Sequence, residues 1–520
     1  MFDRNTLIQQ LKKQSHWDVI IIGGGATGLG IALDSVTRGY KTLLLEQVDF
    51  AKGTSSRSTK LVHGGVRYLA QGHIDLVKEA LYERGLMLNN APHLVSNQSF
   101  IIPSYRWWNH FKYIIGLKIY DFLAGRLSFG KSLSISKETT LSRLSTIKKE
   151  KLKGGVVYHD GQFDDARLAI NMAQTGIEKG ATILNHCKVE HLIKTSDGFI
   201  NGVVTKDIET GTIYNLNAKA VINATGVFTD DILKMDTVAA KNIIRPSQGI
   251  HLVLDRSFLP GNDAIMIPKT DDGRVLFLVP WHNRVVIGTT DTLLDSHSLE
   301  PKPLNTEIEF ILKTANSYLT KSVCKKEVLS VFVGLRPLAA PKNTEEKTKE
   351  ISRSHKIIVS SSGLISITGG KWTTYRRMAQ DTINKAIALG KLPKAKCQTK
   401  TLRIHGADGA SDKNHHLYVY GSDQKGIAHL IKESPELSER IHPRLEFIKA
   451  EIVWAIRQEM ARTVEDILAR RVRILFLDAK AALEVSSMVA SFLMKELNKT
   501  ETWKEAQITS FSKIAKHYIL

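Results

Sequence analysis

Three side chains of this sequence lie in contexts that favour acid–base or anion-binding chemistry. Arg336 lies in segment 334–337, where a glycine and a proline predict a stiff turn on which a fixed guanidinium could hold an anion. His251 lies in an apolar run that predicts a strand, and histidine titrates near neutrality, as a general base must. Lys371 follows two glycines at the start of a predicted helix, whose N-terminus can stabilise negative charge. Each has an ordinary alternative: a salt-bridged arginine, a core histidine and a solvated lysine.

A glycine-rich turn near the N-terminus has the pattern of a dinucleotide-binding site, Gly23-x-Gly25-x-x-Gly28. The first glycine permits a sharp turn, the second lets a pyrophosphate approach the backbone, and the third allows close helix packing. Glu46 follows at the distance expected for a carboxylate that accepts hydrogen bonds from the adenosine ribose. NAD and FAD share this fingerprint, so the pattern by itself leaves the cofactor open.

A βαβ unit must position these glycines. Residues 17–22 form a short, β-branched apolar run that predicts a strand, and the glycines follow it at once. An apolar-periodic stretch then predicts a helix that ends at Arg38, and residues 41–45 predict a second strand that ends in Glu46.

Composition indicates a globular, multi-domain protein. The chain has 520 residues, of which 42% are hydrophobic, and 72 lysines and arginines against 52 acidic residues give a net charge of +20. This charge favours phosphates, nucleic acid or an anionic membrane without choosing among them. We expect neither a membrane-spanning helix nor a secretory signal. The cysteines are far apart, which favours a reducing compartment and argues against disulfides and a metal site: Cys187, Cys324 and Cys397.

A second motif decides between the cofactors. Segment 54–68 is rich in small hydroxyl residues and glycine, and it resembles the second FAD motif of the glycine-oxidase-like (DAO) flavoprotein superfamily. Its ending, from His63 to Tyr68, is most similar to the FAD-dependent (aerobic) glycerol-3-phosphate dehydrogenase family. Segments 220–226, 280–291 and 363–376 resemble further elements of that family, in the same order. Without them, segment 54–68 could be a surface loop.

The resemblance implies an α/β fold with three parts. A Rossmann-like FAD-binding domain is expected at 16–95, 155–235 and 330–390, and an inserted antiparallel-sheet substrate domain at 96–154 and 236–329. Apolar residues at three- and four-residue spacings within 451–473 agree with a C-terminal helical domain at 395–520.

The resemblance also implies FAD as the cofactor and assigns residues to it. The expected cofactor-binding residues are Gly23, Gly25, Gly28, Glu46, Thr54, Ser55, Ser56, Lys60, Leu61, His63, Gly64, Gly65, Ala224, Thr225, Gly226, Gly334, Gly370, Lys371, Trp372 and Thr373. Asp164 and Asp165 begin a predicted helix, and we expect one or the other to be its N-cap rather than a catalytic carboxylate.

The implied reaction is oxidation of glycerol 3-phosphate at C2 by hydride transfer to flavin N5. The expected substrate-binding residues are Arg67, Tyr68, Arg336, Arg353 and Lys371. His251 is the candidate base, and Arg336 or Lys371 is its rival as proton acceptor.

Reoxidation needs an external acceptor, because the sequence has no haem motif, iron–sulfur cysteines or second dinucleotide fingerprint. The resemblance implies a membrane quinone, reached by a homodimer that attaches peripherally to the cytoplasmic, inner face of the cell membrane. The aromatic stretch 107–115 could dip into an anionic lipid interface or pack in the core.

Three other functions compete with this interpretation. A glycerol-3-phosphate oxidase would use oxygen, although the short interval between Arg336 and Lys371 favours a dehydrogenase. An amine-oxidising flavoenzyme would need a carboxylate clamp instead of a phosphate-binding set. A basic RNA-binding flavoprotein ranks last, because no RNA-binding fingerprint is present, and we expect no nucleic-acid partner.

Overall fold

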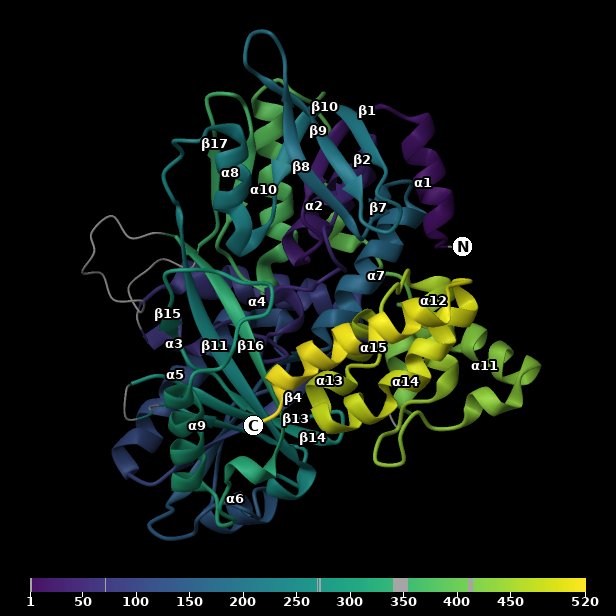
Figure 1. Ribbon diagram of the computed structural model, residues 1–520. Helices are drawn as coiled ribbons and strands as arrows, with labels where there is room; N and C mark the ends of the chain where they lie inside the picture. Colours follow the sequence, from purple (N-terminus) through teal and green to yellow (C-terminus); the bar gives the residue numbers. More distant parts are fainter. Residues whose placement is uncertain (1, 71, 269, 271–272, 340–353, 410–414) are drawn as a thin grey trace.

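The computed structural model describes residues 2–70, 72–268, 270, 273–339, 354–409 and 415–520 (Figure 1). It contains two β-sheets and a C-terminal group of helices. In Figure 1 the first sheet lies at the top, the second lies below it, and the C-terminal helices lie to the right.

The first sheet is built around β1, which pairs in parallel with β2 and β10. Val19 to Ile22 form a continuous apolar run that is buried, as in parallel strands covered on both faces. The strand order is β17-β18-β10-β1-β2-β7, and β8 and β9 extend from β10 as an antiparallel pair. The strands are β1 (His16–Ile22), β2 (Thr42–Leu45), β7 (Thr182–Leu184), β8 (Cys187–Lys194), β9 (Ile200–Asp207), β10 (Ile213–Asn223), β17 (Lys356–Val359) and β18 (Ile365–Thr368).

Helix α2 packs between β1 and two other helices, α7 and α10. Asp164 caps α7 by accepting a hydrogen bond from the backbone N–H of Arg167, as predicted for a structural carboxylate. The helices of this part are α1 (Arg4–Lys13), α2 (Ala26–Thr37), α7 (Asp165–Glu178), α8 (Thr229–Asp236) and α10 (Tyr375–Ala388).

The second sheet is largely antiparallel, in the order β15-β11-β14-β13-β12-β4-β6-β3, with β16 paired to β11 and β5 to β6. Its strands are β3 (Leu61–Val62), β4 (Val95–Ser104), β5 (Leu133–Ile135), β6 (Gly154–Phe163), β11 (Ile244–Asp255), β12 (Ala264–Ile267), β13 (Leu276–Trp281), β14 (Arg284–Gly288), β15 (Thr292–Leu293) and β16 (Val328–Ala339). Its helices are α3 (Val66–Ala70), α4 (Ile74–Asn90), α5 (Trp107–Ala124), α6 (Lys137–Arg143) and α9 (Asn305–Tyr318).

Most of the C-terminal helices share a core of their own, which also includes Trp281, Val286 and Phe332 of the second sheet, whereas Ile427 of the first of these helices belongs to the core around the first sheet. They are α11 (Gln424–Glu433), α12 (Lys449–Gln458), α13 (Ile474–Leu477), α14 (Ala479–Glu496) and α15 (Glu501–Ala515). The expected fold class, a Rossmann-like α/β domain with an antiparallel-sheet domain and a helical C-terminal domain, is confirmed.

Strand pairing differs from the sequence-based boundaries at three strands. One is β3, which pairs with β6 of the second sheet although the range 16–95 places it with the FAD-binding segments. β6 and β16 belong to the second sheet, whereas the ranges 155–235 and 330–390 place them with the FAD-binding segments. β6 and β16 each begin in the second sheet, and the chain leads from their far ends toward the first sheet. Sequence position alone therefore did not show to which sheet they belong.

Candidate active site

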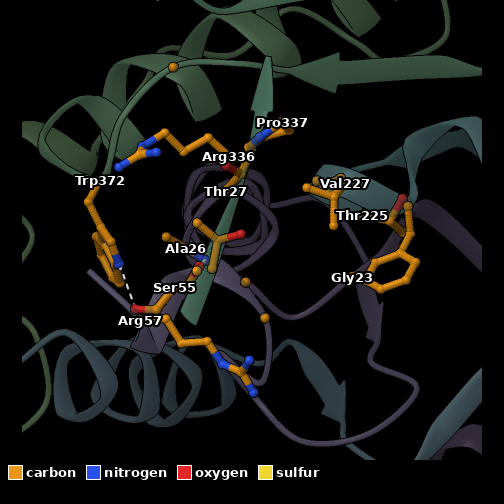
Figure 2. Close-up of a pocket in the computed structure, with 18 of the residues that line it drawn as sticks. Gly23, Ala26, Thr27, Ser55, Arg57, Thr225, Val227, Arg336, Pro337 and Trp372 are labelled. Atoms are coloured by element: carbon orange, nitrogen blue, oxygen red, sulfur yellow. Dashed lines mark hydrogen bonds between the residues drawn. The ribbon is translucent and has the colours of Figure 1, made fainter. Parts of the chain in front are cut away.

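A cavity of about 700 Å³ lies where the two sheets meet. Its wall includes Ile22 from β1, His251 from β11 and Arg336 from β16. Figure 2 shows Trp372 and Ser55 on one side of this cavity and Thr225 and Val227 on the other.

The glycine-rich turn has the geometry that a pyrophosphate requires. Gly23 has φ +108°, and a Cβ on Gly28 would lie 1.9 Å from the carbonyl oxygen of Gly23, so only glycine allows α2 to start this close to β1. Gly25 is the N-cap of α2 and lines the cavity, where an added Cβ would lie 3.1 Å from Ser55 Oγ. The N-terminus of α2 therefore opens on the cavity and can accept an anion.

Glu46 directly follows β2 and lies at the cavity wall. Its carboxylate accepts hydrogen bonds from the backbone N–H groups of Gly24 (2.7 Å) and Val48 (2.9 Å). Burial raises the pKa of Glu46, and these two hydrogen bonds oppose the rise. The side chain is thereby fixed beside the glycine turn, where a ribose would lie.

Three segments that are far apart in the sequence meet at the cavity. The indole N–H of Trp372 donates to the carbonyl oxygen of Ser55 at 2.8 Å (Figure 2). The backbone N–H of His63 donates to Thr373 Oγ1 at 3.3 Å, and that of Ala26 donates to Ser55 Oγ at 2.9 Å. The first glycine turn, the segment 54–63 and the block 369–373 thus form one continuous wall.

Most of the expected cofactor residues line this wall. They are Gly23, Gly25, Glu46, Thr54, Ser55, Leu61, His63, Ala224, Thr225, Gly226, Gly334, Gly370, Lys371, Trp372 and Thr373. The others lie behind the wall: Gly28, Ser56, Lys60, Gly64 and Gly65. Gly64, for example, donates its N–H to the hydroxyl of Tyr120 at 2.8 Å.

Lys60 requires a correction, because its ammonium group points away from the cavity. Lys60 Nζ lies 2.8 and 2.9 Å from the two carboxylate oxygens of Asp165 and donates to the carbonyl oxygen of Ser56 at 2.6 Å. The group is buried and lies 4.9 Å from the ring centroid of Trp281. Its role is to hold segment 56–60 in place, since a buried ammonium needs a partner carboxylate.

Arg336 lines the cavity, but the predicted turn around it is wrong: Arg336 lies inside β16, opposite Ser247 of β11. Pro337 lies opposite Pro246, and neither proline has an N–H to donate. Among the described strands β16 pairs with β11 alone, so the two prolines leave no N–H of the strand pair without a partner. The guanidinium donates to four acceptors: Gln248 O (3.3 Å), Asp291 Oδ1 (3.4 Å), Thr289 Oγ1 (3.2 Å) and Thr290 O (3.0 Å).

Cross-strand pairing brings Arg336 near His251. Residues 247, 249 and 251 of β11 point to one face, and they pair with Arg336, Gly334 and Phe332 of β16. The guanidinium leans over Gly249, where a Cβ would lie 2.4 Å from Arg336 Nη2. A glycine at position 249 therefore makes the space in which the arginine approaches the histidine.

His251 is buried beside the cavity. Its ring stacks on Phe332, with the centroids 4.8 Å apart, and its Nε2 lies 2.8 Å from Thr59 Oγ1. Burial lowers the pKa of His251 well below its usual range, and the positive charges of Lys60 and Arg336 lower it further. The imidazole is thus neutral, and one of its ring nitrogens has a lone pair that can accept a hydrogen bond, while the same surroundings disfavour its protonated form.

Two of the remaining expected substrate residues lie at the cavity, and the side chains of the other two are outside the described part of the structure. Lys371 and Tyr68 both line the cavity, and the ammonium group of Lys371 lies 4.0 Å from the ring centroid of Tyr68. Arg67 lies in α3, although its side chain is outside the described part of the structure. Arg353 lies outside the described residues.

Sequence reasoning missed Thr59, Gly249 and Asp291. Thr59 and Gly249 line the cavity, and Asp291 holds Arg336. Gly249 could have been found from its two-residue spacing to His251 on a predicted strand, because such residues share a face. Asp291 gave no signal, since only the fold brings it to Arg336.

It also missed a link from the C-terminal helices to the cavity wall. Lys52 and Arg57 line the cavity, and both pair with Glu300. Lys52 pairs in addition with Glu465, and the Tyr518 hydroxyl lies 3.3 Å from Glu300. The C-terminal region therefore helps to fix the segment that carries Thr54 and Ser55.

Comparison with known proteins agrees with this site. The family model for FAD dependent oxidoreductases matches residues 18–376, and the model for the C-terminal domain of alpha-glycerophosphate oxidase matches residues 365–507. A probable mitochondrial glycerol-3-phosphate dehydrogenase of Caenorhabditis elegans is 41% identical over 97% of this chain and 74% of its own length. The mitochondrial glycerol-3-phosphate dehydrogenase of Schizosaccharomyces pombe is 38% identical over 99% of this chain and 89% of its own. The chain belongs to the FAD-dependent glycerol-3-phosphate dehydrogenase family.

Solved structures give the same result. A glycerol-3-phosphate dehydrogenase from Bacillus halodurans, solved with FAD, has a TM-score of 0.81 and 31% identity, over 100% of this chain and 99% of that one. The L-alpha-glycerophosphate oxidase of Mycoplasma pneumoniae, at 18% identity and a TM-score of 0.56 over 74% of this chain and 96% of that one, shares the fold. FAD is therefore the cofactor of this chain. The fit is physical as well, because Gly25 and the N-terminus of α2 leave room for a pyrophosphate.

Proposed function

We propose that the chain oxidises sn-glycerol 3-phosphate to dihydroxyacetone phosphate and delivers the electrons to a membrane quinone. One observation carries the substrate assignment: a guanidinium and a neutral imidazole, Arg336 and His251, lie on one face of the β11–β16 pair at the wall of the FAD cavity. A phosphate ester of a secondary alcohol needs this combination of an anion clamp and a proton acceptor.

Each residue has a defined part in the proposed reaction. Arg336 attracts the phosphate through its positive charge, and its four hydrogen bonds to the protein fix the direction of the guanidinium before substrate arrives. His251 is the final acceptor of the C2 hydroxyl proton, because a neutral imidazole has one nitrogen lone pair available. Lys371 lies over Tyr68 and adds positive charge to the substrate side of the cavity. FAD, when bound, supplies the acceptor for the hydride that leaves C2.

The exposed face of α5 supports membrane attachment. Trp108 is 88% exposed and Phe122 is 84% exposed, and Phe111 lies on the same helix with most of its surface in solvent. Exposed basic residues accompany them, among them Lys112 and Lys118. Aromatic and cationic side chains together favour an anionic lipid interface. None of the described helices has the length and apolar character needed to cross a bilayer.

The rest of the proposal concerns assembly and location. The chain acts as a homodimer attached peripherally to the inner, cytoplasmic face of the cell membrane, where quinone is available. Sedimentation of the purified protein would test the dimer, and fractionation of cells would test the location.

A steady-state assay tests the function directly. Purified holoenzyme should oxidise glycerol 3-phosphate with a dye or a short-chain quinone as acceptor, and much more slowly with oxygen alone. Equal rates with oxygen would make the chain an oxidase. No oxidation with any acceptor would refute the substrate assignment.

A further inference from the structure

A threonine hydroxyl lies between the candidate base and the cavity. Thr59 lines the cavity and is half-buried, and its Oγ1 lies 2.8 Å from His251 Nε2. This distance is typical of a strong hydrogen bond between a hydroxyl and an imidazole. The sequence predicted no chemical role for Thr59.

His251 itself offers the cavity little surface. The whole residue is 3% exposed, and Nδ1 is buried without a hydrogen-bond partner among the described residues. The ring is confined on two sides, by the stacked Phe332 and by Gly288, where a Cβ would lie 2.2 Å from His251 Cδ2. The remaining nitrogen, Nε2, is the one that Thr59 covers. A direct proton transfer from substrate to His251 would require Thr59 to move away.

Thr59 is held firmly in this position by its neighbours on both sides. The backbone N–H and the hydroxyl of Ser58 donate to Asp165 at 3.2 and 2.6 Å, and the ammonium group of Lys60 lies 2.8 Å from the same carboxylate. Asp165 is fully buried at the start of α7. One buried carboxylate therefore clamps the residue before Thr59 and the residue after it, which fixes where the hydroxyl points.

We propose that Thr59 is a catalytic residue that relays the substrate proton to His251. The C2 hydroxyl of the bound alcohol gives its proton to Thr59 Oγ1 while Thr59 gives its own hydroxyl proton to His251 Nε2. The electron pair left on the substrate oxygen forms the carbonyl bond as the hydride leaves C2 for bound FAD. The products are the ketone, the reduced cofactor and His251 in its cationic form, so atoms, charge and electrons balance.

The geometry gives the relay a clear advantage over direct transfer. A proton passed between heavy atoms within hydrogen-bond distance needs no movement of the buried ring. The relay also explains why segment 54–60 is anchored so strongly. If the Thr59 hydroxyl moved, the hydrogen-bonded path from the cavity to His251 would be lost.

The inference rests on the proposed function, so the test separates the two. Stopped-flow mixing of the oxidised holoenzyme with glycerol 3-phosphate, without oxygen, follows bleaching of the flavin and isolates hydride transfer from the acceptor. Thr59→Val removes the hydroxyl with little change in shape, whereas Thr59→Ser keeps it. FAD content and thermal unfolding of each variant show whether the fold is retained.

We expect Thr59→Val to bleach about 100-fold more slowly than the wild type, at the low end of the range for acid–base catalysis, and Thr59→Ser to keep most of the rate. His251→Asn should cost a similar factor, and the double variant should be no slower than the slower single variant, because both changes break one relay. The bleaching rate can be plotted against the fraction of D2O in mixtures of H2O and D2O. For the wild type the plot should curve as expected when two protons move in the same step, and for Thr59→Val it should lack this curvature.

Two results would overturn the relay: a Thr59→Val variant as fast as the wild type, or losses for Thr59 and His251 that multiply in the double variant. If glycerol 3-phosphate does not bleach the flavin of the wild-type enzyme, the proposed function is refuted, and the relay with it. A wild-type enzyme that bleaches while Thr59→Val bleaches equally fast would refute the relay alone.

Discussion

Replacing Arg336 with alanine tests the assignment of the phosphate clamp. The guanidinium is three-quarters buried at the cavity wall and is already oriented by Asp291, Thr289 and two backbone carbonyls. A substrate phosphate would therefore meet a donor that has little side-chain freedom left to lose. Arg336→Ala removes this contact completely.

The magnitude follows from the kind of contact. One or two charge-assisted hydrogen bonds contribute on the order of 2 to 4 kcal/mol, which is roughly a 30- to 1000-fold loss in kcat/KM. Arg336→Lys should recover little of it, because an ammonium cannot reproduce the planar fork and cannot satisfy the four acceptors around the guanidinium.

The assay compares two substrates for each variant. Glycerol lacks the phosphate but keeps the secondary alcohol, so Arg336→Ala should change kcat/KM for glycerol far less than for glycerol 3-phosphate. Asp291→Asn is the matched control for the environment of the guanidinium: it removes the paired negative charge, which lies 3.4 Å from Arg336 Nη1, and should lower the KM for the phosphate ester.

One result would refute this reasoning. If Arg336→Ala lowers kcat/KM equally for glycerol and for glycerol 3-phosphate, Arg336 acts on the C2 hydroxyl or on the fold. The phosphate role would then have to pass to another cation, such as Lys371, Arg67 or Arg353.

Three further predictions follow from the structure. Gly25→Val should abolish FAD binding, measured as flavin absorbance per chain, because the branched side chain fills the space at the N-terminus of α2. His405 donates to carboxylates from both ring nitrogens, which raises its pKa from 6.5 to about 9, and it should contribute up to about 3 kcal/mol to the free energy of unfolding. This contribution is complete below about pH 6.5 and is lost as the pH rises toward 9, so urea unfolding should show stability falling across that window. Trp108→Glu and Phe111→Glu should weaken cosedimentation with anionic vesicles, because each places a negative charge on the exposed face of α5.

Matched controls make these outcomes decisive. His405→Gln should remove the pH-dependent loss, whereas His429→Gln, at an exposed ion pair, should leave it; a loss that survives His405→Gln would contradict the assignment. Phe199 is 56% exposed in the hairpin of β8 and β9, and Phe199→Glu should not change vesicle binding. Vesicle binding that falls equally for Phe199→Glu and Phe111→Glu would remove α5 as the docking face. Full flavin occupancy in Gly25→Val would make the glycine motif a turn without a binding role.

The local parts of this site could be predicted from the sequence. The glycine spacing, the apolar run before it and Glu46 after it lie within a single βαβ unit, so short-range patterns contain the geometry of the turn. Asp164 was expected at a helix N-terminus for the same reason and caps α7. The block around Trp372 was also expected at a strand end and a helix start, and it lies between β18 and α10.

Contacts between distant segments could not be predicted in this way. Lys60 was expected at the cofactor, but it turns inward, because the fold places Asp165 behind it and a buried ammonium pairs with the nearest carboxylate. Arg336 was expected on a turn because its neighbour is a proline, but Pro337 lies opposite Pro246 in a pair of strands where neither N–H is needed. Both errors come from long-range partners.

Residues that are close in the chain were enough to predict a dinucleotide-binding, Rossmann-like unit, and the motifs indicated FAD, because both features depend on local spacing. The arrangement of the site residues around the cavity depends on contacts between distant segments. The register of β11 and β16 sets Arg336 beside Gly249 and near His251, and the packing of α7 sets Thr59 in front of the histidine. Strand register and helix packing are properties of the whole core. A local sequence pattern therefore does not predict which distant side chains register and packing bring together.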